Sequence, residues 1–89
     1  MKKYVLNQKI VAKEIEGNIV LIDMANSTYF TFNRVGSEVV RLIQEGKNLD
    51  EILSELCTRY SDVESGIIQE DVSSVLKDAE EKNLIREEG

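Results

Sequence analysis

Few side chains in this sequence of 89 residues could carry out covalent chemistry. There is no histidine and only one cysteine, Cys57, so the commonest general base is missing and a zinc or iron–sulfur site cannot be built. Seventeen acidic residues remain, and a pair such as Glu80 and Glu81 could act as acid and base. Nothing in the pattern indicates the burial that tunes a carboxylate for that task. Cys57 is either a small buried residue or a reactive thiol. We therefore predict no enzymatic activity, no metal and no cofactor.

The segment from Ser27 to Phe32, "STYFTF", offers a different chemistry, that of its main chain. It holds three of the five aromatic residues and no charged residue, proline or glycine. In a strand, Tyr29 and Thr31 face one way, and Phe30 and Phe32 face the other way, toward a core. An edge strand is normally protected by lysine or proline. This edge is therefore either covered by a helix or open to a partner strand.

Three strands and three helices must position this segment. Short β-branched and aromatic runs predict strands at 9–15, 19–24 and 28–32, joined by turns at 16–18 and 25–27. From Asn33 the apolar residues recur with a helical period, interrupted by a turn at 45–48 and a loop at 61–66. The third helix is expected at about 68–82. The order predicts one α+β domain over residues 1–89, with a three-stranded antiparallel sheet followed by three helices and a core within about 10–85.

The acidic composition limits the partners. The formal net charge is −6 and the sequence pI is about 4.6. Binding that depends on neutralising phosphates, and docking on an anionic membrane, are both disfavoured. The single cysteine and the charged N-terminal segment, which contains no signal-peptide core, predict a cytoplasmic protein.

Several motifs in this order resemble the PqqD-like family, the recognition elements of pathways that make and modify ribosomal peptides. They are an apolar strand ending in Asp ("VLID", 20–23), an aromatic strand ending in Asn ("YFTFN", 29–33), a glycine at 36, and the two helical segments "EGKNLDEILSELCTRY" and "QEDVSSVLKDAEEKNLI". The resemblance covers about 10–85 and implies a winged-helix-like arrangement. Phe32, Ala79 and Asn83 depart from the usual leucine, larger aliphatic residue and glycine. The smaller Ala79 would widen the groove beside it.

The resemblance implies a non-catalytic chaperone that binds the leader of a precursor peptide. The leader would add a fourth strand to the aromatic strand, against the third helix, and be delivered to a radical SAM enzyme, a cyclase or a leader protease. Carried over by position, the peptide-binding residues are Thr28, Tyr29, Phe30, Thr31, Asp71, Val75, Asp78, Ala79 and Lys82.

Some of these positions have a second interpretation. Val75 and Ala79 lie close enough to the apolar stripe of the third helix to be core residues, and Asp71 is a favourable charge in its first turn. Asn33 is expected to cap the first helix, and Gly36 to allow that helix to approach the preceding strand.

Two other functions remain open. Three strands and three helices can also form a winged-helix nucleic-acid-binding domain, although the second helix, "LDEILSELCTRY", carries one arginine against three acidic residues. The domain could also be a scaffold that binds a folded partner.

Overall fold

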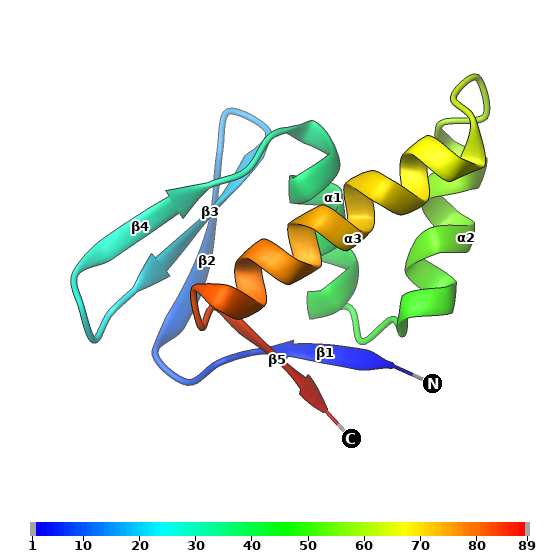
Figure 1. The fold of residues 1–89 in the computed structure, drawn as a ribbon. Coiled ribbons are helices and arrows are strands. Elements are labelled where there is room, and N and C mark those ends of the chain that lie inside the picture. Colours follow the sequence, from blue (N-terminus) through cyan, green and yellow to red (C-terminus); the bar gives the residue numbers. More distant parts are fainter. Residues whose placement is uncertain (1, 89) are drawn as a thin grey trace.

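The architecture in a computed structural model, which describes residues 2–88, confirms the predicted α+β class. Strands β2 (Ile10–Ile15), β3 (Asn18–Asp23) and β4 (Thr28–Thr31) form an antiparallel sheet in the order β2-β3-β4. Helices α1 (Arg34–Gln44), α2 (Leu49–Arg59) and α3 (Ser65–Glu81) follow and lie together on one side of the sheet (Figure 1). Helix α3 begins three residues earlier than expected, inside the segment predicted as a loop. Met1 and Gly89, which the expected domain includes, lie outside the described residues.

The sequence prediction missed a second sheet. Strand β1 (Lys3–Leu6) pairs antiparallel with β5 (Ile85–Glu88), with Tyr4 opposite Glu87 and Leu6 opposite Ile85. Figure 1 shows this ribbon beneath the helices. Its β1 strand is tied to the start of α2, because the Leu49 N–H donates to the Lys2 carbonyl at 2.8 Å. The N-terminal segment therefore pairs with the C-terminal segment and leaves β4 uncovered.

Local signals correctly predicted where α1 and α2 begin and where α1 and α3 end. The Asn33 side chain caps α1, and Asn48 with Glu51 forms the expected capping box at the start of α2. Gly46 and Asn83 adopt the left-handed backbone that ends α1 and α3, with φ of 86° and 60°. The stripes of the three helices then meet the sheet in one core, which contains the fully buried Leu21, Val39, Ile52, Leu56 and Val72.

A carboxylate holds the turn that leads into β4. Asp23 Oδ1 accepts hydrogen bonds from the backbone N–H groups of Ala25 (3.0 Å) and Asn26 (3.2 Å), and Oδ2 accepts one from Asn26 Nδ2 (2.9 Å). These bonds favour the charged carboxylate, and the Asn26 side chain is the largest cause of the lowered pKa of Asp23. The turn therefore fixes where β4 begins.

We expect the turn to weaken in acid. Because the pKa of Asp23 is lower in the folded protein than its ordinary value of 3.8, its stabilising contribution is complete above that value and is lost as the pH falls through the folded-state pKa. Amide shifts of Ala25 and Asn26, followed by NMR from pH 6 to pH 2, should report a midpoint below 3.8. An Asp23→Asn variant should lack this titration, and a wild-type midpoint at or above 3.8 would contradict the assignment.

Among residues 2–88, no helix is both long enough and apolar enough to cross a membrane.

Candidate functional site: a cleft between strand β4 and helix α3

Strand β4 has one partnered edge and one open edge. It pairs with β3 through Leu21 opposite Phe30 and Ile22 opposite Tyr29, and no other strand among residues 2–88 pairs with it. The Phe32 N–H donates to the Ile19 carbonyl at 3.2 Å, so Phe32 points its main-chain groups at β3. Hydrogen-bonded positions alternate along an antiparallel ladder, and the N–H and C=O groups of Tyr29 and Thr31 therefore point away from the sheet.

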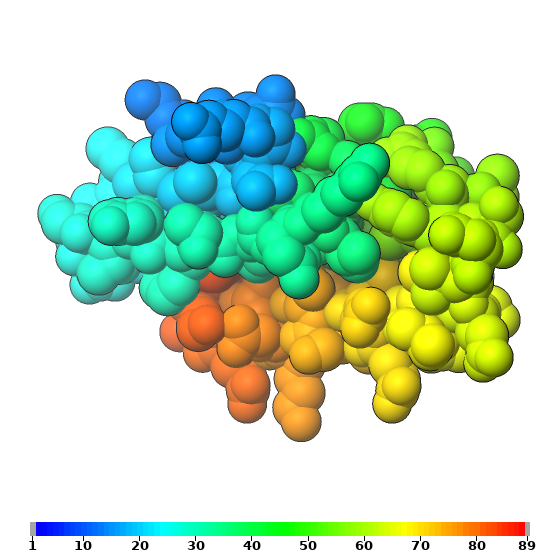
Figure 2. Space-filling model, turned by 90° about the horizontal axis from the view of Figure 1, so that it is seen from above, coloured from blue at the N-terminus to red at the C-terminus, as the bar shows by residue number. Residues whose placement is uncertain are grey.

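A cleft of about 700 Å³ lies beside this open edge. One wall is β4 with the segment after it, and the other is the C-terminal half of α3. In Figure 2 the cyan and teal surface of β4 and the segment after it lies next to the orange surface of α3. The lining residues are Tyr29, Phe30, Thr31, Phe32, Asn33, Ser74, Val75, Lys77, Asp78, Glu81, Lys82 and Leu84.

The cleft brings together six of the nine residues expected from the sequence, namely Tyr29, Phe30, Thr31, Val75, Asp78 and Lys82. The other three lie elsewhere. Ala79 is only 2% exposed and belongs to the core beneath α3. Thr28, at the start of β4, lines a hollow on the other face of the sheet, and Asp71 lines a separate hollow near the start of α3.

Six lining residues were not expected: Phe32, Asn33, Ser74, Lys77, Glu81 and Leu84. Ser74, Lys77 and Glu81 lie three and four residues apart, which places them on one face of a helix together with Asp78. This spacing could have identified them from the sequence as one exposed face of the third helix. The expected set instead followed the flank that carries Asp71 and Ala79.

The cleft has an apolar floor and a charged rim. Phe30 and Val75 are partly buried and pack against the core, and Leu84 is buried. Lys82 Nζ lies 5.5 Å from the centre of the Phe30 ring and 2.8 Å from Asp78 Oδ2. The Lys82 ammonium therefore contacts both walls of the cleft, β4 through Phe30 and α3 through Asp78. Lys77 and Glu81 add one charge of each sign. The rim therefore offers partners to both acidic and basic groups.

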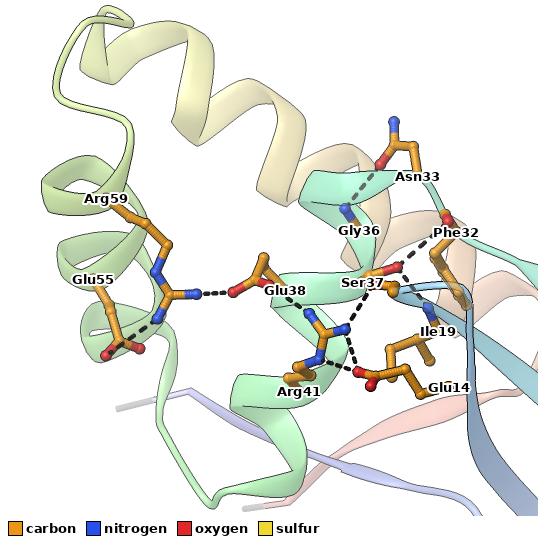
Figure 3. Close-up of polar contacts among 11 residues, drawn as sticks. Glu14, Ile19, Phe32, Asn33, Gly36, Ser37, Glu38, Arg41, Glu55 and Arg59 are labelled. Atoms are coloured by element: carbon orange, nitrogen blue, oxygen red, sulfur yellow. Dashed lines mark hydrogen bonds and ion pairs between the residues drawn. The ribbon is translucent and has the colours of Figure 1, made fainter.

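Helix α1 fixes the position of the chain at the end of β4 through hydrogen bonds of Ser37. The Ile19 N–H donates to the buried hydroxyl of Ser37 at 2.8 Å, and that hydroxyl donates to the Phe32 carbonyl at 3.4 Å (Figure 3). Ser37 thus extends the β3–β4 ladder through a side chain. A Cβ atom at Gly36 would lie 3.1–3.2 Å from atoms of Phe32. The predicted role of Gly36, close approach between the helix and the strand, is confirmed.

Ion pairs connect the sheet to α1 and α2. Arg41 of α1 pairs with Glu14 of β2 and with Glu38, and Glu38 also pairs with Arg59 of α2 (Figure 3). The Arg41 guanidinium donates to the Gly17 carbonyl as well, at 2.8 Å. Arg59, the one basic residue of α2, is therefore engaged by acidic side chains instead of contributing to a basic patch.

The arrangement is suited to binding an extended chain. An uncharged strand edge supplies hydrogen bonds, and a partly apolar cleft beside it can accept side chains. The other edge strand of the sheet, β2, carries Lys13 and Glu14, charges of the kind that discourage strand pairing.

Among residues 2–88, no group of three or more Cys, Asp and Glu side chains is placed to hold a metal ion.

Fold and cleft together define a small α+β domain whose open sheet edge faces a helix. The chain belongs to the PqqD family: residues 18–85 match the family described as coenzyme PQQ synthesis protein D (PqqD). The family indicated by the sequence motifs is therefore confirmed. No curated protein matches the chain significantly.

Two solved structures share the fold. TbiB1, in a structure described as a complex with the TbiA(beta) leader peptide, is 29% identical, with a TM-score of 0.84 over 92% of this chain and 94% of TbiB1. A lasso peptide synthetase B1, described as complexed with the leader peptide, is 17% identical, with a TM-score of 0.82 over 94% of this chain and 98% of its own. The second likeness concerns the fold alone.

Proposed function

We propose that this protein recognises the leader of a ribosomally made precursor peptide. The leader binds as an additional antiparallel or parallel strand on β4, with alternate side chains in the cleft against α3. The protein has no catalytic role of its own and presents the bound peptide to a separate modifying enzyme.

The open edge of β4 beside the cleft is the observation that carries this proposal. Tyr29 and Thr31 direct up to four main-chain groups toward a guest strand, and no described element competes for them. The likeness to TbiB1, at 29% identity over nearly the whole of both chains, supports the same ligand class. No comparable observation favours nucleic acid, because the net charge is −6 and Arg59 is ion-paired.

Main-chain hydrogen bonds alone cannot supply a useful affinity. Four such bonds contribute about 2–6 kcal/mol in total, at about 0.5–1.5 kcal/mol each. Ordering a disordered leader costs about 2–5 kcal/mol, and micromolar binding needs about −8 kcal/mol. Buried side chains must therefore supply most of the net binding free energy. Phe30, Val75 and Leu84 form the apolar floor that can receive them.

An NMR titration with the leader of the precursor peptide encoded beside this protein tests the proposal. We expect the largest amide shifts at 28–32 in β4 and at 74–82 in α3, because a guest strand would contact both walls. The amides of Tyr29 and Thr31 should also become protected from hydrogen exchange, since they would donate to the guest. A scrambled leader of the same composition is the control.

Shifts confined to α2 would overturn the proposed mode, and so would binding without added protection at Tyr29 and Thr31. Failure to bind any leader, combined with binding to a folded partner, would favour the scaffold function.

A further inference from the structure

The sheet has a second surface, on the face turned away from the helices. Register places Val11 opposite Ile22, and Ile22 opposite Tyr29, so these side chains share one face. The buried Leu21 and Ile19 point to the opposite face, into the core. No helix among the described residues covers the face that carries Val11, Ile22 and Tyr29 (Figure 1). We call it the outer face; its residues are Val11, Lys13, Ile15, Asn18, Val20, Ile22, Met24, Tyr29 and Thr31.

The outer face is unusually apolar. The solvent side of an antiparallel sheet is normally polar, yet Lys13 is the one charged residue of this set. Tyr29 is 71% exposed, Ile15 53% and Val11 44%, and Met24 is exposed as well. A hollow of about 650 Å³ runs across the face from Ile15 of β2 to Tyr29 of β4. An exposed apolar surface of this kind marks an interaction site.

The width of the surface indicates the kind of partner. From β2 to β4 it spans two strand spacings, about 10 Å in total. A leader on the edge of β4 would contact Tyr29 but would not reach Val11 or Ile15. A second copy of this chain is disfavoured, because each copy carries a net charge of −6. The occupant that remains is a different, folded protein with an apolar contact surface.

The outer face is also continuous with the cleft. Tyr29 and Thr31 line both the cleft beside α3 and the hollow on the outer face. A protein docked on the outer face would therefore lie within about one strand spacing, 5 Å, of a peptide on β4. The alternate side chains of that peptide would extend the outer face next to Tyr29.

We propose that the outer face is the docking surface for the modifying enzyme that receives the peptide. This inference rests on the proposed function, since it assumes that β4 holds a leader. Val11, Ile15 and Met24 make the contact, and Tyr29 lies between the docked enzyme and the bound peptide.

A double substitution on β2 tests the docking surface. Val11→Lys with Ile15→Lys places two charges on the outer face, on the strand farthest from β4. Using the purified enzyme encoded beside the precursor peptide, we expect the double variant to bind it at least tenfold more weakly by calorimetry. Affinity for the leader should change less than twofold. Ile67→Lys is the matched control, because Ile67 is similarly exposed (48%) but lies at the start of α3.

Circular dichroism and thermal melting verify that each variant is folded. If the double variant does not fold, the single Met24→Lys variant, in the turn directly after β3, is measured instead, with the same expected loss of enzyme affinity. Unchanged enzyme affinity in a folded variant overturns the inference. So does a wild-type protein that does not bind the enzyme, or one that sediments as a dimer dissociated by the substitutions. Failure of the wild-type protein to bind leader is a separate result that contradicts the proposed function, because enzyme binding is measured without peptide.

Discussion

Replacing Thr31 with proline should weaken leader binding about tenfold to a hundredfold while the protein remains folded. The N–H of Thr31 points away from β3, so its removal costs no hydrogen bond within the sheet. Proline is tolerated on an edge strand at such a position. In the complex, however, a carbonyl of the guest strand would lose its donor, which costs about 1–3 kcal/mol. Calorimetric titration of the leader into each protein measures the difference.

The opposite edge of the sheet provides the matched control. Ala12 of β2 faces Leu21 across the sheet, and the ladder geometry directs its N–H outward, as at Thr31. An Ala12→Pro variant therefore makes the same backbone change on a strand that does not line the cleft against α3. Its leader affinity should stay within twofold of the wild type. Equal losses from both substitutions, or none from Thr31→Pro, would mean that the leader does not pair with β4.

Truncating Tyr4 to alanine should cost about 3 kcal/mol of the free energy of unfolding. Tyr4 is 4% exposed and packs into the core from β1, a strand that the sequence prediction did not include. The same burial raises the pKa of the Tyr4 phenol above its ordinary value. In a domain of this size, the loss should lower the melting temperature by more than about 10 °C.

Tyr29→Ala is the control for this measurement, because it removes the same atoms from a side chain that is 71% exposed. We expect it to cost less than about 1 kcal/mol. Urea denaturation of the two variants gives the comparison. Similar costs at the two positions would show that the β1–β5 ribbon does not form part of the stable core.

Part of the site could be predicted from the sequence, because the sequence features that indicate it act over a few residues. Asn33 and Gly36 mark the start of α1, and the uncharged run from Ser27 to Phe32 marks an unprotected strand. Each of these features depends on neighbours a few residues away. The meander and the order of the helices were therefore predicted correctly, and the strand chosen from these signals is the one that lines the cleft.

The other wall of the cleft depends on how α3 is rotated about its axis. Successive residues of a helix differ by about 100° in direction, so an error of one position replaces a surface residue with a buried one. Ala79 was expected in the cleft and lies in the core, whereas Lys77 and Glu81, two positions before and after it, line the cleft. Packing of α3 against α1, α2 and the β1–β5 ribbon sets this rotation. The helical period of the α3 sequence does not specify it.

The sequence alone determined the α+β class, the element order, the caps and the uncharged character of β4, because short-range hydrogen bonds and hydrophobic periodicity specify them. Only the tertiary structure decided that β1 pairs with β5, about 80 residues away, and that the edge of β4 consequently stays open. Long-range pairing of two four-residue strands leaves almost no periodic signal. It depends instead on burying Tyr4 and Ile85 in a core that the rest of the chain must first form.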